Sequence, residues 1–316
     1  MTDYHPYKRK VYALGETVLD LVSDDGITFL AIPGGSVLNA SVSLGRMGMD
    51  IELISEFGSD KAGNSIEEFL KNNAVQTSFC IRHAENKTSI ALAFLNKTRS
   101  ASYSFYHDSL EKLTETPLPV FQKNDILLFG SFYSVKPDRR DFILKVLKRA
   151  VEAGSVIYYD LNIRKAHSGD LNALMPSYMN NIAVASIVKG SDEDFLNLFG
   201  LSDPEAIYEK LNSYCKILII TNGSKPLHVF TPSFHKTYKV PAITPVSTVG
   251  AGDNFNAGFI YGLIISGMDS PTIKDISVSE MDRLAGSGLD FATETCLSPE
   301  NYIKGIFGPD FRKNYI

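Results

Sequence analysis

Cysteine is scarce in this chain of 316 residues, and the chain has no excess of basic residues, with 31 Lys and Arg against 36 Asp and Glu. The three cysteines, Cys80, Cys215 and Cys296, are far apart and lack metal-ligand spacing. They indicate neither a disulfide framework nor a zinc site, so we expect a reducing compartment. The net charge of −5 argues against a general nucleic-acid or anionic-membrane binder, which normally carries a basic face. Any phosphate site must then be local, built from backbone N–H groups and a few cations.

Long apolar runs are also missing. The longest, residues 255–266, is too short and too interrupted by glycine to span a bilayer. The first ten residues are polar and basic and lack the apolar core of a signal peptide. We therefore expect a cytoplasmic protein with no membrane or nucleic-acid partner. Its length suits one large α/β domain or two smaller ones.

Several catalytic motifs are absent from the sequence. There is no Gly-x-Ser-x-Gly elbow of a serine hydrolase and no P-loop, and the six histidines form no pair at a metal-binding spacing. A dinucleotide fingerprint would need a third glycine where Phe255 stands. A nicotinamide enzyme that uses Gly250 and Gly252 is therefore a disfavoured alternative.

Short apolar runs alternate with segments of helical periodicity along most of the chain. This order predicts an α/β fold with a mostly parallel central sheet and helices on both faces. Gly48 and Gly154 stand where helices should end in a left-handed residue. The predicted strands are Val11–Leu14, Ile51–Ser55, Ile126–Phe129, Val156–Asp160, Ile182–Val188 and Ile217–Thr221. The predicted helices are Ser36–Met47, Lys61–Asn72, Asp138–Glu152, Asp192–Phe199, Asp253–Ile265 and Met281–Glu294.

Two segments break this alternation. Thr17–Val22 and Ile27–Ala31 flank an Asp-Gly turn and predict a hairpin. Ile90–Leu95 and Ala101–Tyr106 alternate apolar and polar residues and predict a second hairpin. Together they predict a small β-sheet lid over a crevice; the alternative is two edge hairpins of the main sheet. The expected organisation is a single domain, 1–316, with a lid formed by about 17–31 and 90–106.

The turn Ser247–Asp253 is the most informative part of the sequence. Its glycines allow close approach of a ligand, and the free N–H groups of the helix that follows favour an anion. Asp253 in the same turn can take a proton from a hydroxyl. The segment therefore offers a cradle for developing negative charge and a base for an acceptor alcohol. The structural alternative is a glycine-rich turn with an ordinary helix-capping Asp.

Two weaker signals near the N-terminus suit hydroxyl recognition. Gly34 and Gly35 precede a helix that carries Asn39, whose amide is both donor and acceptor. Asp20 lies in the strand after Gly15-Glu16, and a carboxylate can accept two hydroxyl hydrogen bonds. Taken alone, each is also compatible with an ordinary turn or a solvated strand residue.

Two further signals lie at predicted strand ends, where ligands of open α/β sheets bind. Asp160 to Arg164 close an apolar strand, and Arg164 is suited to a phosphate. Thr221-Asn222-Gly223 ends another strand and offers a hydroxyl and a flexible backbone to a nucleotide. A salt-bridged loop and a simple turn are the structural alternatives.

The order of these motifs resembles that of the ribokinase-like (PfkB) carbohydrate kinases. The resemblance covers roughly residues 12–297, and Thr248–Asp253 is its most specific piece. It implies a central sheet with helices on both faces and a small β lid. In the family this lid often serves for dimerisation, so a homodimer through the lid is one expected assembly. It also implies ATP-dependent phosphorylation of a sugar hydroxyl, with Mg²⁺ bridging the phosphates.

The resemblance assigns expected roles to individual residues. Asp253 matches the catalytic base, and Gly250, Ala251 and Gly252 match the anion hole. Sugar contacts are expected from Asp20, Gly34, Gly35 and Asn39, with Tyr106 and Arg164 as further substrate-binding residues. Thr221, Gly223 and Asp194 are expected on the nucleotide side, and no residue is assigned as a direct metal ligand.

Several positions depart from the family pattern. Ser247 replaces an Asp in a region that supports a monovalent cation in many members, so potassium dependence is left open. The usual Asn-x-x-Glu, which helps to order Mg²⁺ through water, falls on Ser191 to Asp194 and keeps one carboxylate. Pro226 replaces a glycine near the nucleotide, and Thr293 replaces a late Asn on the adenine side.

The opening Gly15–Asp20 and the strand Tyr103–Tyr106 look most like the fructokinase and 2-keto-3-deoxygluconate kinase branch. Kinases of the keto-acid tend to place an Arg where this chain has His107, and imidazole suits a carboxylate less well. A neutral ketose such as fructose is therefore the expected substrate. Alternatives are a 2-keto-3-deoxygluconate kinase, a ribokinase or a nucleoside kinase. From a different class, the alternative is a non-catalytic module that binds a sugar or nucleotide.

Overall fold

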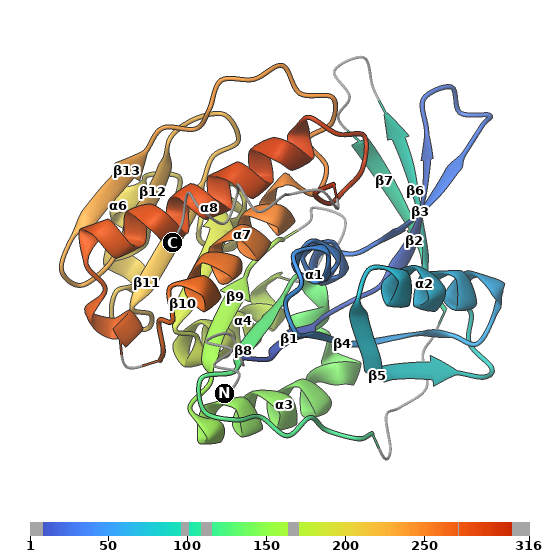
Figure 1. The fold of residues 1–316 in the computed structure, drawn as a ribbon, viewed down its shortest axis with the longest axis horizontal. Helices are drawn as coiled ribbons and strands as arrows, with labels where there is room; N and C mark the ends of the chain where they lie inside the picture. The colour runs from blue at the N-terminus through green and yellow to red at the C-terminus, as the bar shows by residue number, and fades with distance from the viewer. Residues whose placement is uncertain (1–8, 96–100, 109–115, 164–170, 271, 305–316) are drawn as a thin grey trace, which may run out of the picture.

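Nine strands form one large sheet in a computed structural model that describes residues 9–95, 101–108, 116–163, 171–270 and 272–304 (Figure 1). In spatial order they are β5 (Val75–His83), β4 (Ile51–Gly58), β1 (Val11–Leu14), β8 (Ile126–Gly130), β9 (Val156–Asp160), β10 (Ile187–Ser191), β11 (Ile217–Thr221), β12 (Leu227–Phe230) and β13 (His235–Tyr238). The first seven strands in this order run parallel, and β12 and β13, at one edge, are antiparallel.

Helices cover both faces of the large sheet, as the sequence predicts. Side chains alternate along each strand, so Val11 and Ala13 join one core while Tyr12 and Leu14 join the other. Burial on both faces explains why the strands are almost continuously apolar. The first core is covered by α1 (Ser36–Arg46), α2 (Lys61–Asn72), α7 (Ala251–Ile265) and α8 (Val278–Cys296). The second is covered by α3 (Arg140–Ala153), α4 (Leu171–Val184), α5 (Asp192–Phe199) and α6 (Pro204–Leu211).

Short 3₁₀ turns complete the described elements, at η1 (Phe132–Val135), η2 (Pro137–Arg139) and η4 (Thr272–Asp275). Gly48 and Gly154 have φ values of 76° and 74°, which confirms the predicted left-handed helix ends. The helices within the described ranges are all too short or too polar to cross a membrane.

One predicted strand was misplaced. The run Ile182–Val188 is not a strand throughout, because α4 continues to Val184 and β10 begins only at Ile187. Ile182, Ala185 and Val188, from both parts of the run, are buried in the same core, so apolar character continues across the junction. Periodicity alone cannot separate a buried helix end from a buried strand over so few residues.

The two predicted hairpins form one small sheet, separate from the large one (Figure 1). Its order is β3-β2-β6-β7, with β2 (Val18–Ser23), β3 (Leu30–Gly34), β6 (Ile90–Leu95) and β7 (Ala101–Tyr106). Each hairpin is antiparallel, and a parallel β2–β6 pair joins them. The alternative of two edge hairpins on the main sheet is therefore wrong.

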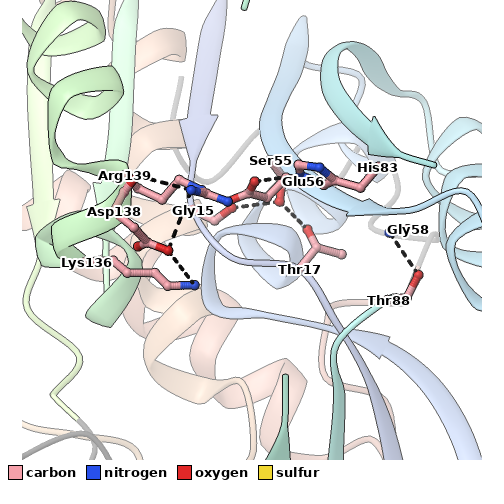
Figure 2. Close-up of polar contacts among 10 residues, drawn as sticks. All are labelled: Gly15, Thr17, Ser55, Glu56, Gly58, His83, Thr88, Lys136, Asp138 and Arg139. Carbon is pink, nitrogen blue, oxygen red and sulfur yellow. Dashed lines mark hydrogen bonds and ion pairs between the residues drawn. The ribbon is translucent and has the colours of Figure 1, made fainter. Parts of the chain in front are cut away.

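Hydrogen bonds fix the chain where it passes from the large sheet to the small sheet (Figure 2). The Ser55 hydroxyl at the end of β4 donates to the Gly15 carbonyl at 2.7 Å and lies 2.7 Å from the Thr17 hydroxyl. Where the chain enters the small sheet a second time, just before β6, the Gly58 amide donates to the Thr88 hydroxyl at 3.1 Å. Both segments that enter the small sheet are thus hydrogen-bonded to β4.

A buried ionic cluster lies beside these ties. The Glu56 carboxylate accepts from Arg139 Nε at 2.6 Å and from His83 Nε2 at 2.8 Å (Figure 2). An ionised carboxylate only accepts hydrogen bonds, so the proton of this pair lies on Nε2 of His83. Arg139 is 0% exposed, and a buried charge is tolerated only when it is paired. The cluster therefore joins β4, β5 and η2 at the base of the small sheet.

We expect the substitution Glu56→Gln to lower the free energy of unfolding by about 3 kcal/mol, because it leaves the buried Arg139 charge with only the part-exposed Asp138 carboxylate, 3.6 Å from Nη1, as a partner. The urea midpoint of unfolding, followed by circular dichroism, measures this loss. The matched control is Glu152→Gln, which breaks the exposed pair of Glu152 with Lys148 and should change stability by no more than about 0.5 kcal/mol. Equal midpoints for the two variants would contradict a stabilising role of the cluster.

Candidate active site

A cavity lies between the small sheet and the loops that follow the central parallel strands. The small sheet contributes Val18, Asp20 and Phe105 to its lining. The loops after β8 and β9 contribute Ser131 and Asn162, at the strand ends where ligands of open sheets bind. The starts of two helices complete the lining, with Gly35, Ser36 and Asn39 from α1 and Val249, Gly250 and Asp253 from α7.

The turn at the start of α7 lines this cavity and contains a left-handed residue. Gly250 is the N-cap residue, and its φ of 80° is left-handed. A Cβ atom there would also lie 2.4 Å from the Asn301 carbonyl oxygen, so glycine is the residue that fits. The Ala251 amide donates to the Thr248 carbonyl at 3.3 Å. The other N–H groups of the first turn have no acceptor within the helix, and such groups beside a cavity suit an anion. Gly250 lines the cavity, whereas Ala251 and Gly252 do not.

Asp253 is in the first turn of α7 and is only 8% exposed. Both of its carboxylate oxygens are held by α1. The Ser36 hydroxyl donates to Oδ1 at 2.7 Å, and Asn39 Nδ2 donates to Oδ2 at 2.9 Å. These two contacts fix the orientation of the carboxylate while one edge of it still lines the cavity.

Asn39 has a second polar atom to satisfy. Its amide oxygen Oδ1 is buried and has no hydrogen-bond partner within the described part of the chain. A buried acceptor without a partner costs about 1–3 kcal/mol. Because Asn39 lines the cavity, a hydroxyl of a bound ligand is a suitable partner.

Asp20 reaches the cavity from β2 because Gly34 leaves room for it. The two residues lie on neighbouring strands, and a Cβ on Gly34 would stand 2.1 Å from Asp20 Oδ2. Asp20 is 6% exposed and lines the cavity together with Gly35 and Asn39. The structure thus brings together the predicted sugar-side residues Asp20, Gly34, Gly35 and Asn39 beside Asp253.

Two other residues, Tyr106 and Arg164, were predicted to bind the substrate, and the described part of the structure does not place either of them in the cavity lining. Tyr106 is 59% exposed and does not line the cavity, whereas its neighbour Phe105 does. Successive residues of a strand point to opposite faces of a sheet, so only one of the pair can face the cavity. Arg164 lies outside the described residues. Its neighbour in the same motif, Asn162, lines the cavity.

The residues predicted on the nucleotide side do not line this cavity. Thr221 ends β11 directly beside Ser191 at the end of β10, and Gly223 follows with a positive φ of 54°. The Asp194 carboxylate accepts from the amides of Ser191 and Ile163, both at 2.6 Å. Asp194 therefore caps α5 and connects it to the loop after β9.

Sequence reasoning missed one charged residue, Lys189. It is 5% exposed and its Nζ lies 3.0 Å from Asp160 Oδ1. Burial raises the pKa of Asp160 to about 6, and the charge of Lys189 opposes that rise. Asp160, predicted at the ligand crevice, is instead buried behind the α7 turn. The available signal was a lysine within the otherwise apolar strand β10.

Direct metal ligands are a separate question. In the described ranges, no group of three or more His, Cys, Asp or Glu side chains is arranged to hold a metal ion. Mg²⁺ keeps several waters and usually binds substrate phosphates together with one or two carboxylates.

Two relatives are similar over most of the chain. "Probable fructokinase-5" of Arabidopsis thaliana is 27% identical over 278 residues, which are 84% of this chain and 85% of that protein. "Aminoimidazole riboside kinase" of Salmonella typhimurium is 26% identical over 257 residues, or 80% of this chain and 81% of that protein.

A solved structure shares the fold. A fructokinase double mutant from Vibrio cholerae O395, determined with fructose, ADP and potassium ion, superposes with a TM-score of 0.84 at 21% identity. The superposition covers 97% of this chain and 98% of that one. The family model described as "pfkB family carbohydrate kinase" matches residues 8–272. The chain therefore belongs to the pfkB family of carbohydrate kinases.

Proposed function

We propose that this protein transfers the γ-phosphoryl group of ATP to a hydroxyl of a neutral sugar, with a ketose such as fructose as the favoured acceptor. One observation carries the proposal. The Asp253 carboxylate and the N-cap residue Gly250, at the start of α7, line a single cavity together with Asp20 and Asn39. A base and an anion site are thus adjacent to groups that recognise hydroxyls.

In the proposed reaction, Asp20 and Asn39 hold the sugar and Asp253 takes the proton of the acceptor hydroxyl. Asp253 is suited to this role because Ser36 and Asn39 fix its carboxylate. The turn of Gly250, Ala251 and Gly252 stabilises the charge that develops on the phosphoryl group. Phosphoryl transfer depends mainly on such positioning and charge stabilisation. A general base typically adds about 10²–10⁴-fold.

The nucleotide is proposed to bind over the ends of β10 and β11, beside Thr221 and Gly223. Mg²⁺ would accompany the phosphates and neutralise part of their charge, with Asp194 as the nearby carboxylate of the matching motif. ADP bound in the V. cholerae fructokinase structure supports the use of an adenine nucleotide.

The charge of the cavity favours a neutral acceptor. Glu16, Asp20 and Asp253 all line it, and no Lys or Arg occurs among the described lining residues. His107 lies 3.5 Å from Glu16 Oε1, so its ring faces an acid rather than the cavity centre. An anionic sugar acid would meet three carboxylates there, which opposes binding.

A riboside is the second candidate acceptor. The aminoimidazole riboside kinase relative motivates it, and Phe105 and Phe132 line the cavity. Aromatic faces suit the stacking of a flat heterocycle.

A homodimer through the small sheet is also proposed. Ile27 is 84% exposed and Leu30 is 65% exposed at its outer end, next to the half-exposed pair Phe29 and Phe94. Apolar side chains gathered at an exposed edge mark a contact surface. In this assembly the small sheet would act as the lid of the cavity and as the dimer interface.

We expect Asp253→Asn to lower kcat by about 10²–10⁴-fold, because the amide cannot accept the hydroxyl proton. Its KM for the sugar should change little, since Asn retains the hydrogen bond from Asn39 or Ser36. The measurement is steady-state turnover by coupled ADP release. Asp275→Asn removes an exposed carboxylate remote from the cavity and should leave kcat unchanged. Near-normal turnover of the Asp253 variant would remove it as the base.

We expect a panel of acceptors with ATP and Mg²⁺ to give the highest kcat/KM with fructose or another neutral ketose. The panel includes ribose, 2-keto-3-deoxygluconate and purine and aminoimidazole ribosides, each followed by ADP release. A preference for the sugar acid would contradict the charge argument, and a preference for a riboside would establish the second candidate. Thermal stabilisation by sugar or ATP without any ADP release would instead identify a non-catalytic binding module.

We expect Ile27→Glu to shift the protein from dimer to monomer, because it places a charge on the proposed apolar interface. Light scattering after size-exclusion chromatography measures the mass. The control Val151→Glu adds the same charge at a half-exposed position of α3 and should leave the mass unchanged. A wild-type protein that is already monomeric at micromolar concentration would refute this assembly.

A further inference from the structure

A buried ammonium group lies directly behind the anion-binding turn of α7. Lys189 and Asp160 are register neighbours on the parallel strands β10 and β9. Ile187 belongs to the core covered by α7, and Lys189, two residues along, points to the same face. A Cβ placed on Gly252 would lie 3.1 Å from Lys189 Nζ. The ammonium is therefore in contact distance of the backbone that forms the turn.

The ammonium is held in place by a chain of buried hydrogen bonds. Lys189 Nζ donates to Asp160 Oδ1 at 3.0 Å, and Asn256 Nδ2 donates to Asp160 Oδ2 at 2.7 Å. The Tyr158 hydroxyl in turn donates to Asn256 Oδ1 at 3.0 Å. All four residues are at most 5% exposed. Asn256 is three residues after Asp253, so the chain links Lys189 to the same helix that carries the proposed base.

Neighbouring carboxylates keep Lys189 charged despite its burial. Burial is the largest single effect and lowers the pKa of Lys189, but the charges of Asp160, Asp194 and Asp253 and the hydrogen bond to Asp160 together outweigh it. The net pKa lies above the ordinary value. The Lys189 ammonium thus stays charged among Asp160, Asp194 and Asp253. Without it, a phosphoryl group at the α7 turn would face only negatively charged side chains.

We propose that Lys189 is a positioning residue for phosphoryl transfer, whose ammonium attracts the transferring group to the backbone amides at Gly252. This inference rests on the proposed kinase function and adds to it a fixed protein cation behind the anion hole. An oriented charge in a site shielded from water stabilises developing charge far better than one in solvent. A purely structural role, in which Lys189 only neutralises Asp160, is the competing explanation.

Two variants separate these roles. Asp160→Asn keeps the ammonium and removes its acid, whereas the double variant Lys189→Met/Asp160→Asn removes both. The double variant leaves no unpaired buried charge and does not change the net charge of the group. We expect its kcat to fall about 10²-fold relative to Asp160→Asn, with the KM for the sugar unchanged. Lys148→Met, on an exposed lysine, is the surface control and should retain wild-type turnover.

The outcome depends on the difference between the two variants. If both variants unfold well above the assay temperature and the double variant is as active as Asp160→Asn, Lys189 serves only to neutralise Asp160 and the inference is overturned. If the wild-type protein phosphorylates no sugar, the proposed function fails instead. In that case thermal stabilisation by inorganic phosphate still tests Lys189. Stabilisation of the wild type and of Asp160→Asn, but not of the double variant, supports it, and equal stabilisation of all three overturns it.

Discussion

The first turn of α7 is the constraint on which the rest of the site depends. In the proposed site it must offer backbone amides of the first helical turn to an anion and also keep the Asp253 carboxylate almost fully out of water. Neither condition is favourable alone, because free amides and a buried carboxylate both need partners. The structure meets the second condition with Ser36 and Asn39, which hydrogen-bond to the carboxylate from α1. The free amides remain as the feature that a ligand completes.

Two layers of structure hold this turn from opposite sides. On the cavity side, α1 begins directly after Gly34 and Gly35, so the chain that leaves the small sheet also fixes Asp253. On the far side, the Lys189–Asp160 pair and Asn256 connect β10, β9 and α7. A buried pair of this kind contributes little net stability compared with apolar packing. The Lys189 ammonium lies against Gly252. This placement is therefore better explained by an electrostatic effect on the α7 turn than by stabilisation of the fold.

Much of this arrangement was predictable from the sequence because it depends on local signals. The apolar strands, the αL glycines and the Asp-Gly hairpin each follow from short-range chemistry, and apart from the strand expected at Ile182–Val188 the structure confirms them. What could not be predicted depends on neighbours distant in sequence. Tyr106 and Phe105 are equally plausible as cavity residues until the pairing of β7 with β6 decides which face each takes. Asp160 resembled a crevice residue because nothing in its own strand indicates that Lys189 lies beside it.

The distribution of charge links the acceptor and the phosphoryl donor. The cavity lining carries three acids, Glu16, Asp20 and Asp253, which suit the hydroxyls of a neutral sugar and repel a second anion. The phosphoryl group is itself anionic, so it can approach Asp253 only where positive potential outweighs that repulsion. In the proposed reaction, the amides of the α7 turn and the Lys189 ammonium behind it would supply such potential. Selectivity for a neutral acceptor and binding of a charged donor would then coexist, because the positive groups gather at the α7 turn, whereas Glu16 and Asp20 reach the cavity from other segments.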